Sequence, residues 1–368
     1  MMKKLTLFSL ALAAVVIILG AYTRLTDAGL GCPDWPGCYG SLTVPLSEEK
    51  VAAANQAYPE RPVESFKAWN EMIHRYFAGT LGLCVLAIAI LAVRQRKQGT
   101  PLKLPLLLLG LIIFQAALGM WTVTLNLLPV VVMGHLLGGF SVISCLFVLY
   151  LRLREREEKS ELGDGALDDS AKLATLSRLR NFALLGIAVL VVQIGLGGWT
   201  SANYAALACT ELPVCEDGWQ QRLDFEGAFS VPDAENYEFG AHDYGERVTI
   251  HVVHRFGALI TTVYLLALGL TVLRNKLGST KQKQIARLML GFLAIQVGLG
   301  LSNIIFMLPL AVAVMHNAVA AALLMSLIYL VYSLAGPYFF ARPVANYHAH
   351  SSANSSHILT KVTGGFHG

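Results

Sequence analysis

Four histidines stand in apolar segments of this chain, where ionisable side chains are rare: His74, His135, His254 and His316. Ionisable groups inside a bilayer are energetically costly, so they usually mark a functional site. Neutral imidazole is a common metal ligand, and two facing helices of a bundle can ligate one haem iron from both sides. These residues therefore indicate tetrapyrrole binding within a membrane. For any single histidine, the alternative is an interhelical hydrogen bond.

The composition indicates that these segments lie in lipid. Hydrophobic residues make up 55% of the 368 residues and charged residues 14%, against about 25% charged residues in soluble proteins. A helix needs about 20 apolar residues to cross the hydrocarbon layer. Eight runs are long enough: 5–23, 69–93, 104–125, 128–151, 181–200, 249–273, 285–306 and 308–335. We predict an all-α integral membrane protein. The modest net charge of +4, with no long basic block, gives no indication of nucleic-acid binding.

Lysine and arginine are distributed unevenly between the two sides predicted for the membrane. With the N-terminus inside, 20 of the 28 basic residues fall in the N-terminus, the inner turns, the central linker and the C-terminal tail. Basic residues concentrate on the cytoplasmic side of membrane proteins. Both termini are therefore expected in the cytoplasm, with two large outer loops at 24–68 and 201–248.

The two halves of the chain resemble each other. The stretch GAYTRLTDAGLGC at 20–32 aligns with GGWTSANYAALAC at 197–209, HRYFAG at 74–79 with HRFGAL at 254–259, and FQAALG at 114–119 with IQVGLG at 295–300. We therefore predict two parallel four-helix bundles, related by a pseudo-twofold axis along the membrane normal. Lys3 and Lys4 before the first run are also typical of a cleaved signal peptide. The match of this run to an internal helix predicts that it is retained.

The repeat divides the chain into four parts. Residues 1–151 form the N-terminal four-helix unit, and residues 181–335 form the C-terminal one. A charged cytoplasmic linker, 152–180, joins them, and residues 336–368 form a polar cytoplasmic tail with the composition of a disordered segment.

The four histidines are predicted to form one layer. Each lies five to eight residues from the outer end of its run, or roughly 7–12 Å below the outer boundary of the membrane. Pairing within each half joins His74 with His135 and His254 with His316. This predicts two tetrapyrrole sites in the outer leaflet. Gln115, Gln193 and Gln296 each precede a Leu-Gly pair, which we interpret as helix packing with an interhelical hydrogen bond.

Three positions beside the histidines carry further ionisable groups. Glu71 precedes His74 by three residues and shares its helix face, so it could act as a base or stabilise positive charge on a substrate. The alternative is a glutamate that faces water. The equivalent position in the second half is His251, to which the sequence assigns no role. Arg75 and Arg255 are expected to meet haem propionates, or to reach lipid phosphates.

Two cysteine pairs with the same spacing occupy equivalent outer loops: Cys32 with Cys38, and Cys209 with Cys215. On the oxidising side of a bacterial membrane each pair can close a disulfide. A zinc site made of four cysteines is an alternative, although this spacing is not the usual one. A third alternative is a pair that changes reversibly between two thiols and a disulfide.

Together, EMIHR, GHLLGG, VVHRF and MHNAVA, in this order and at this depth, resemble haem A synthases over about residues 5–335. The resemblance implies oxidation of the C8 methyl group of haem O to a formyl group, giving haem A for cytochrome c oxidase. It implies substrate haem at His74 and His135, a permanent haem b at His254 and His316, and Glu71 close to the substrate. It also implies importance for the first cysteine pair, and a bacterial inner membrane location.

The implied partners are membrane lipid, haem O and haem A, an electron acceptor, and a haem O synthase or oxidase assembly factors. Two other functions are compatible with some of these residues. A di-haem b, quinol-linked electron-transfer subunit would explain four histidines, but such proteins commonly place haems near both membrane faces. A non-redox transporter with a parallel repeat would bind no haem.

Overall fold

The computed structural model describes residues 1–98, 100–161 and 170–335 of the chain. Every regular element in these residues is a helix, and eight helices are long and apolar enough to span a membrane. They overlap the eight apolar runs predicted from the sequence. The protein is therefore an all-α, multi-pass membrane protein, as predicted.

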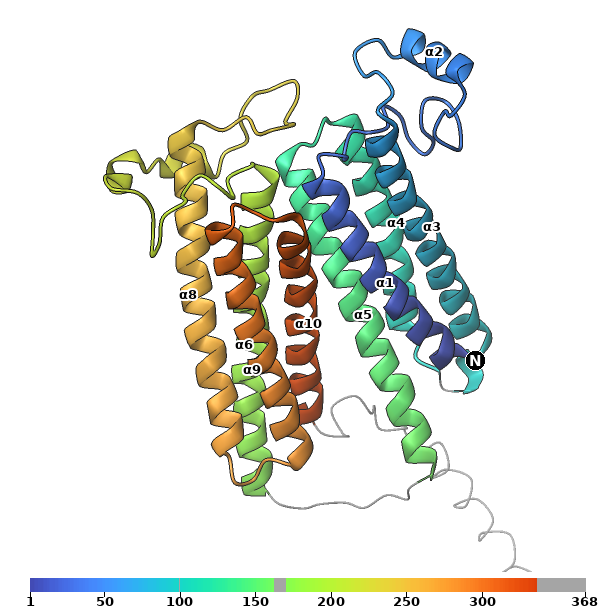
Figure 1. Cartoon of the computed structure of the whole chain (residues 1–368). Helices are drawn as coiled ribbons and strands as arrows, with labels where there is room; N and C mark the ends of the chain where they lie inside the picture. Colours follow the sequence, from blue (N-terminus) through green and yellow to red (C-terminus); the bar gives the residue numbers. More distant parts are fainter. Residues whose placement is uncertain (99, 162–169, 336–368) are drawn as a thin grey trace, which may run out of the picture.

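Four helices form the first bundle: α1 (Met2–Leu25), α3 (Ser65–Arg94), α4 (Lys103–Thr124) and α5 (Pro129–Glu161). Figure 1 shows them side by side, in blue to green. Helices α1 and α4 each pack against both α3 and α5. Within the described residues α3 and α5 have no close backbone approach to each other. They therefore occupy opposite corners of the bundle and can face each other across its interior.

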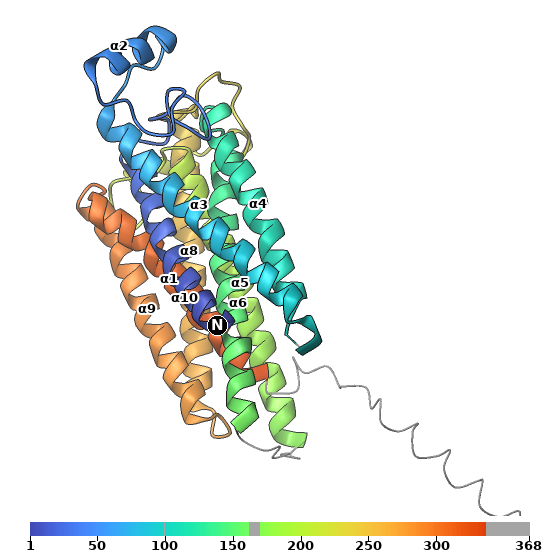
Figure 2. The same ribbon diagram turned by 90° about the vertical axis from the view of Figure 1, so that its right-hand side faces the viewer.

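The second bundle repeats this arrangement with α6 (Ser170–Ala202), α8 (Tyr244–Arg274), α9 (Thr280–Ile305) and α10 (Leu310–Ala335). Helices α6 and α9 each pack against both α8 and α10. The bundles meet where α1 contacts α10, α5 contacts α6, and α5 contacts α10. Figures 1 and 2 show the long outer segments at one end of both bundles and the N-terminus at the other. This neighbour pattern is the one that a twofold repeat would produce.

The turns between paired helices repeat as well. Asn126 and Leu127 join α4 to α5 with φ of 50° and 62°, and Met307 and Leu308 join α9 to α10 with φ of 56° and 61°. Left-handed backbone is unfavourable for residues with a side chain. Its recurrence at equivalent sites indicates that both tight turns have the same required geometry. Pro129 then begins α5, where no backbone donor is needed.

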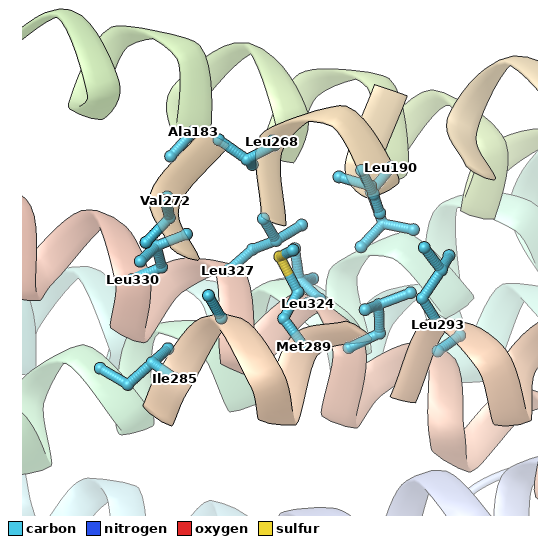
Figure 3. Close-up of a cluster of buried hydrophobic side chains, with 14 of the residues drawn as sticks. Ala183, Leu190, Leu268, Val272, Ile285, Met289, Leu293, Leu324, Leu327 and Leu330 are labelled. Carbon is cyan, nitrogen blue, oxygen red and sulfur yellow. The ribbon is translucent and has the colours of Figure 1, made fainter. Parts of the chain in front are cut away.

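The inner halves of the bundles are closed by aliphatic packing. In the second bundle Leu268, Met289, Leu324 and Leu327 are fully or almost fully buried in one cluster, drawn in Figure 3. In the first bundle a similar cluster contains Ile88, Leu108, Ile143, Leu146 and Leu149. The named members on α3, α5, α8 and α10 lie two turns or more beyond the histidine of their own helix, toward the inner end. Aliphatic side chains therefore fill much of the inner half, where a few polar side chains such as Thr6, Ser9 and Ser326 are also buried.

Several elements differ from the sequence prediction. Helix α5 continues to Glu161, and helix α6 begins at Ser170. The described part of the predicted linker 152–180 is therefore helical. Leucine, arginine, lysine and glutamate favour helix even outside lipid. Residues 162–169 and the predicted tail 336–368 lie outside the described residues. Short helices missed from the sequence are α2 (Glu48–Ala57), η1 (Arg96–Gln98), η2 (Trp219–Arg222) and α7 (Phe225–Ala228).

One polar cluster joins the two bundles at the outer end. Arg24 Nη1 donates to the hydroxyl of Tyr204 at 2.5 Å, and Nη2 donates to the carbonyl of Ser201 at 2.7 Å. The guanidinium also lies 4.0 Å from the centroid of the Tyr204 ring. The Tyr204 hydroxyl donates in turn to Asp27 at 3.1 Å. These contacts fix the end of α1 against the end of α6.

Candidate haem sites and outer disulfide loops

Each of the four layer histidines rests against a glycine on a neighbouring helix. A Cβ atom placed on that glycine would lie only 3.0 to 3.4 Å from Cε1 of the imidazole. A larger residue would therefore displace the ring. The pairs are Gly20 with His74, Gly119 with His135, Gly197 with His254, and Gly300 with His316. We call these four glycines the glycine seats.

The first bundle brings His74 and His135 together from α3 and α5. Their ring centroids are 6.5 Å apart and the ring planes are inclined by 84°. Two metal–imidazole bonds of about 2 Å, together with the radius of each ring, require a separation of about 6 Å. The Nδ1 atoms of both histidines are buried and have no hydrogen-bond partner in the described structure. Spacing and free donor atoms both fit one metal held between the two rings.

The second bundle places His254 on α8 and His316 on α10, the corresponding opposite corners. Both rings are half-buried, and each rests on its glycine seat. The candidate ligands are again two imidazole nitrogens from facing helices, which suits an axially ligated haem. The residues present in both bundles therefore fit the tetrapyrrole sites expected from the sequence. The assignment of each histidine as an iron ligand stays a prediction.

Glu71 connects the first histidine site to the outer loop above it. Its side chain is only 5% exposed, which contradicts the alternative of a glutamate that faces water. One carboxylate oxygen accepts the backbone N–H of Cys32 at 2.8 Å, and the other is paired with Arg75. Both oxygens are therefore engaged, and the carboxylate anchors the loop to α3.

Arg75 holds the same loop by several backbone carbonyls. Its Nη1 donates to the carbonyl of Asp34 at 2.9 Å and also to that of Gly37. The side chain is 12% exposed, so it does not extend to lipid phosphates. The structure thus gives Arg75 a loop-binding role. Its predicted contact with a propionate is not tested by these contacts and stays a prediction.

In the second bundle, different residues hold the corresponding outer loop against α8. The backbone nitrogen of Cys209 lies 3.3 Å from Nδ1 of His251, and Arg255 Nε lies 3.2 Å from His251 Nε2. A neutral imidazole accepts a hydrogen bond at only one of its two nitrogens, so one of these two N–H groups donates to the ring. Arg255 also donates to the carbonyls of Cys209 at 2.6 Å, Glu211 at 2.7 Å, and Val214. His251 therefore takes the structural place of Glu71. The sequence identified this position but not the shared loop-anchoring role.

Both cysteine pairs close disulfides, Cys32 with Cys38 and Cys209 with Cys215. The disulfides leave no thiolate for the zinc site considered from the sequence. In the second loop, Glu216 accepts the hydroxyl of Thr210 at 2.7 Å and its N–H at 2.8 Å. These hydrogen bonds lower the pKa of Glu216 to about 2. The loop is therefore closed by a charged carboxylate as well as by the disulfide.

The interhelical hydrogen bond predicted for the glutamines is present at Gln193 and Gln296, but the contact of the glycine seats with the histidines was not predicted. The Leu-Gly pairs were interpreted as close helix packing, whereas their glycines contact the histidines. Gln193 Nε2 lies 3.0 Å from Nδ1 of His254, and Gln296 Nε2 lies 3.3 Å from Nε2 of His316. The recurring Gln-x-x-Leu-Gly spacing was the available signal.

Fold and site together define a class: a multi-pass helical membrane protein whose two four-helix bundles carry paired histidines beneath disulfide-closed outer loops. A family model described as cytochrome oxidase assembly protein (COX15-CtaA) matches residues 3–328. The chain belongs to this family.

Curated relatives extend the similarity over most of the chain. A protein of Shewanella oneidensis named "Heme A synthase" is 49% identical over 328 residues, which cover 89% of this chain and 94% of that protein. Proteins of the same name from Chelativorans sp. and Caulobacter sp. are 28% and 27% identical. Their alignments cover 84% and 85% of this chain, and 84% and 90% of the relatives.

Proposed function

We propose that this chain is a haem A synthase, an oxidoreductase that converts the C8 methyl group of haem O to the formyl group of haem A. The observation that carries this proposal is the similarity, along most of the chain, to the Shewanella oneidensis protein of that name. The paired histidines supply a site that suits a haem substrate. The product would serve cytochrome c oxidase, in agreement with the family description.

The first bundle is proposed to bind the substrate, with His74 and His135 as axial ligands of haem O. The support is their 6.5 Å ring separation and their free Nδ1 atoms. The second bundle is proposed to hold a resident haem b between His254 and His316. When bound, that haem supplies one-electron redox chemistry. Domain roles follow: residues 1–151 bind substrate, and residues 181–335 bind the cofactor.

Glu71 is proposed as the residue that makes the first site reactive. Oxidation of a methyl group conjugated to a porphyrin places positive charge on its carbon, which a nearby carboxylate stabilises. Both Glu71 oxygens are already engaged by Cys32 and Arg75. These contacts hold the carboxylate in a fixed position, and pairing with Arg75 favours its charged form, which suits an electrostatic role. His251, at the equivalent position, cannot supply the negative charge.

We propose a bacterial inner membrane location with both termini in the cytoplasm. The concentration of basic residues in the inner segments supports this orientation. The disulfide loops then face the oxidising compartment, where such bonds persist. The partners are haem O and haem A, membrane lipid, an electron acceptor, and a haem O synthase or oxidase assembly factor as the source and destination of haem.

Haem extraction tests the proposal. The chain is expressed in cells that contain a haem O synthase and have no haem A synthase of their own, and extracted haems are identified by mass spectrometry. Haem A should appear only when both the chain and the haem O source are present. The proposed activity would be refuted if cells with the chain and the haem O source accumulated haem O but no haem A, although the purified chain showed a normal Soret band.

A further inference from the structure

We propose that a groove between the two bundles binds one anionic phospholipid, with an acyl chain in the groove and the phosphate beside Lys281. The groove lies in the inner half of the helices, away from the histidine layer and from the outer loops. Such a site is separate from the proposed haem chemistry and goes beyond it. The bound lipid joins helices of different bundles that do not touch each other.

The groove follows from the way in which the bundles meet. Helix α10 contacts both α1 and α9, whereas the described residues of α1 and α9 make no close backbone contact with each other. Figure 1 shows α10 between these two helices. The space has a volume of about 360 Å³, which lies within the range of small-molecule sites. Of its lining residues, Ile143 and Ser326 are buried, whereas Leu7, Ala11 and Leu288 are exposed. The groove is therefore open toward the lipid.

The lining of the groove suits a hydrocarbon chain. Ser326 and Tyr329 carry the only side-chain oxygen atoms among its lining residues, and the Ser326 hydroxyl already donates to the Leu323 carbonyl at 2.7 Å. On α1 the lining residues from Leu7 to Ala14 span about 10 Å along the helix axis. An acyl chain fits such a space because it needs no polar partner. Close van der Waals packing holds it there, since the surrounding lipid is equally apolar.

The charge at the inner end of the groove identifies the class of lipid. Lys281, in the first turn of α9, has its Nζ atom 5.3 Å from the centroid of the Tyr329 ring, the innermost lining residue on α10. Its side chain is exposed, and no carboxylate of the described residues forms an ion pair with it. Lys3, one turn before Leu7 on α1, is already paired with Glu157. Basic pockets between helices at the cytoplasmic face bind anionic head groups. Lys281 is therefore the ammonium group that is available to a phosphate.

The positive charge also distinguishes between two kinds of apolar chain. An uncharged isoprenoid chain can enter the groove, but it offers no anionic group to Lys281. The charge and its place at the inner end therefore favour a phospholipid. In the groove, the acyl chain contacts α1 of the first bundle and α9 of the second, so it stabilises their arrangement through many small dispersion contacts.

The first test measures the phospholipid that the purified full-length protein retains after exhaustive washing in detergent, by native mass spectrometry. Wild type should retain one anionic phospholipid per chain. Ala11→Phe places a ring in the groove and should abolish this retention. The matched control is Ala267→Phe, which adds the same ring at an exposed alanine on α8, in the inner half but outside the groove. This control should retain the phospholipid as wild type does.

The second test concerns the head group. Washed wild-type protein should bind added phosphatidylglycerol more tightly than phosphatidylcholine. Lys281→Gln should weaken the binding of phosphatidylglycerol by about fivefold, the scale for one basic residue at a membrane surface, and leave that of phosphatidylcholine unchanged. Lys276→Gln, which changes an exposed lysine in the turn between α8 and α9, is the control and should bind as wild type does. Phosphatidylglycerol should raise the midpoint of thermal unfolding of wild type but not of Ala11→Phe.

Equal retention by wild type and Ala11→Phe would overturn the site. Equal binding of phosphatidylglycerol by wild type and Lys281→Gln would overturn the role of the lysine, and this surface substitution decides the head group even where Ala11→Phe fails to fold. Retention of an isoprenoid in place of a phospholipid, lost in Ala11→Phe, would overturn the choice of ligand. None of these measurements involves haem, so a chain that makes no haem A would refute the proposed function and leave the lipid site untouched.

Discussion

The carboxylate of Glu71 accepts the backbone N–H of Cys32 at 2.8 Å, which joins the proposed reactive group directly to a disulfide loop. The equivalent contact in the second bundle is made by a histidine, from His251 to Cys209 at 3.3 Å. Two similar loops are thus anchored by a carboxylate in one bundle and by an imidazole ring in the other. Anchoring alone does not require a negative charge, so the charge of Glu71 calls for another role.

Replacing Glu71 separates these two roles. Glu71→Gln keeps an oxygen that can accept the Cys32 N–H but removes the negative charge. Haem content should stay normal, while conversion of haem O falls by about 100-fold, the scale for loss of one electrostatic stabiliser. Extracted haems and the Soret absorbance measure the two quantities. His251→Gln is the matched variant and should keep its activity. Normal haem A production by Glu71→Gln would remove the carboxylate from the mechanism.

The histidine pairs make a prediction about which haem is lost. His254→Ala and His316→Ala should each abolish the haem that remains after purification, because an axially ligated iron loses half of its protein ligands. His74→Ala and His135→Ala should retain that haem but fail to convert haem O. Pyridine haemochrome analysis gives the haem per protein. Full haem content in both His254→Ala and His316→Ala would contradict the pairing in the second bundle.

The Thr210–Glu216 contact predicts a pH-dependent loop. The pKa of Glu216 falls from an ordinary 4.5 to about 2 in the folded loop. The contribution of the carboxylate to loop stability is therefore complete above pH 4.5, and it is lost as pH falls toward 2. At pH 7, Glu216→Gln should speed reduction of Cys209–Cys215 by a phosphine. Near pH 2 wild type and variant should converge.

The first loop serves as an internal control for that experiment. Reduction of Cys32–Cys38, measured by mass spectrometry in the same samples, should not respond to the Glu216→Gln substitution. Equal acceleration of both disulfides would indicate general unfolding rather than loss of the Glu216 hydrogen bonds. A constant ratio of wild-type to variant rates from pH 7 to pH 2 would also contradict the predicted protonation.

The Arg24–Tyr204 contact predicts coupling between the bundles. Tyr204→Phe removes hydrogen bonds with Arg24 and Asp27 but keeps the ring under the guanidinium, and should cost about 1 kcal/mol of stability. Arg24→Ala removes the ring contact and the bond to Ser201 as well, and should cost about 2–3 kcal/mol. Thermal unfolding in detergent measures both effects. Equal losses in the two variants would show that the ring contact and the Ser201 bond contribute little.

The sequence by itself determined the class of the fold and the candidate residues. Apolar runs of this length have one way to satisfy their backbone groups in lipid, which is a helix. Repeat offsets placed four histidines at one depth, and they isolated Glu71 by comparison with His251. These inferences needed only periodicity, spacing and the cost of burying polar groups, all of which are properties of the chain itself.

The tertiary structure alone decided which groups meet. Glu71 and Cys32 are 39 residues apart, and Arg255 and Cys209 are 46 apart, so no local pattern specifies their contacts. The same holds for each histidine and its glycine seat, which belong to different helices. The physical reason is that helical period fixes the direction of a side chain only within its own helix. The packing of the helices determines which glycine, glutamine or loop N–H stands opposite.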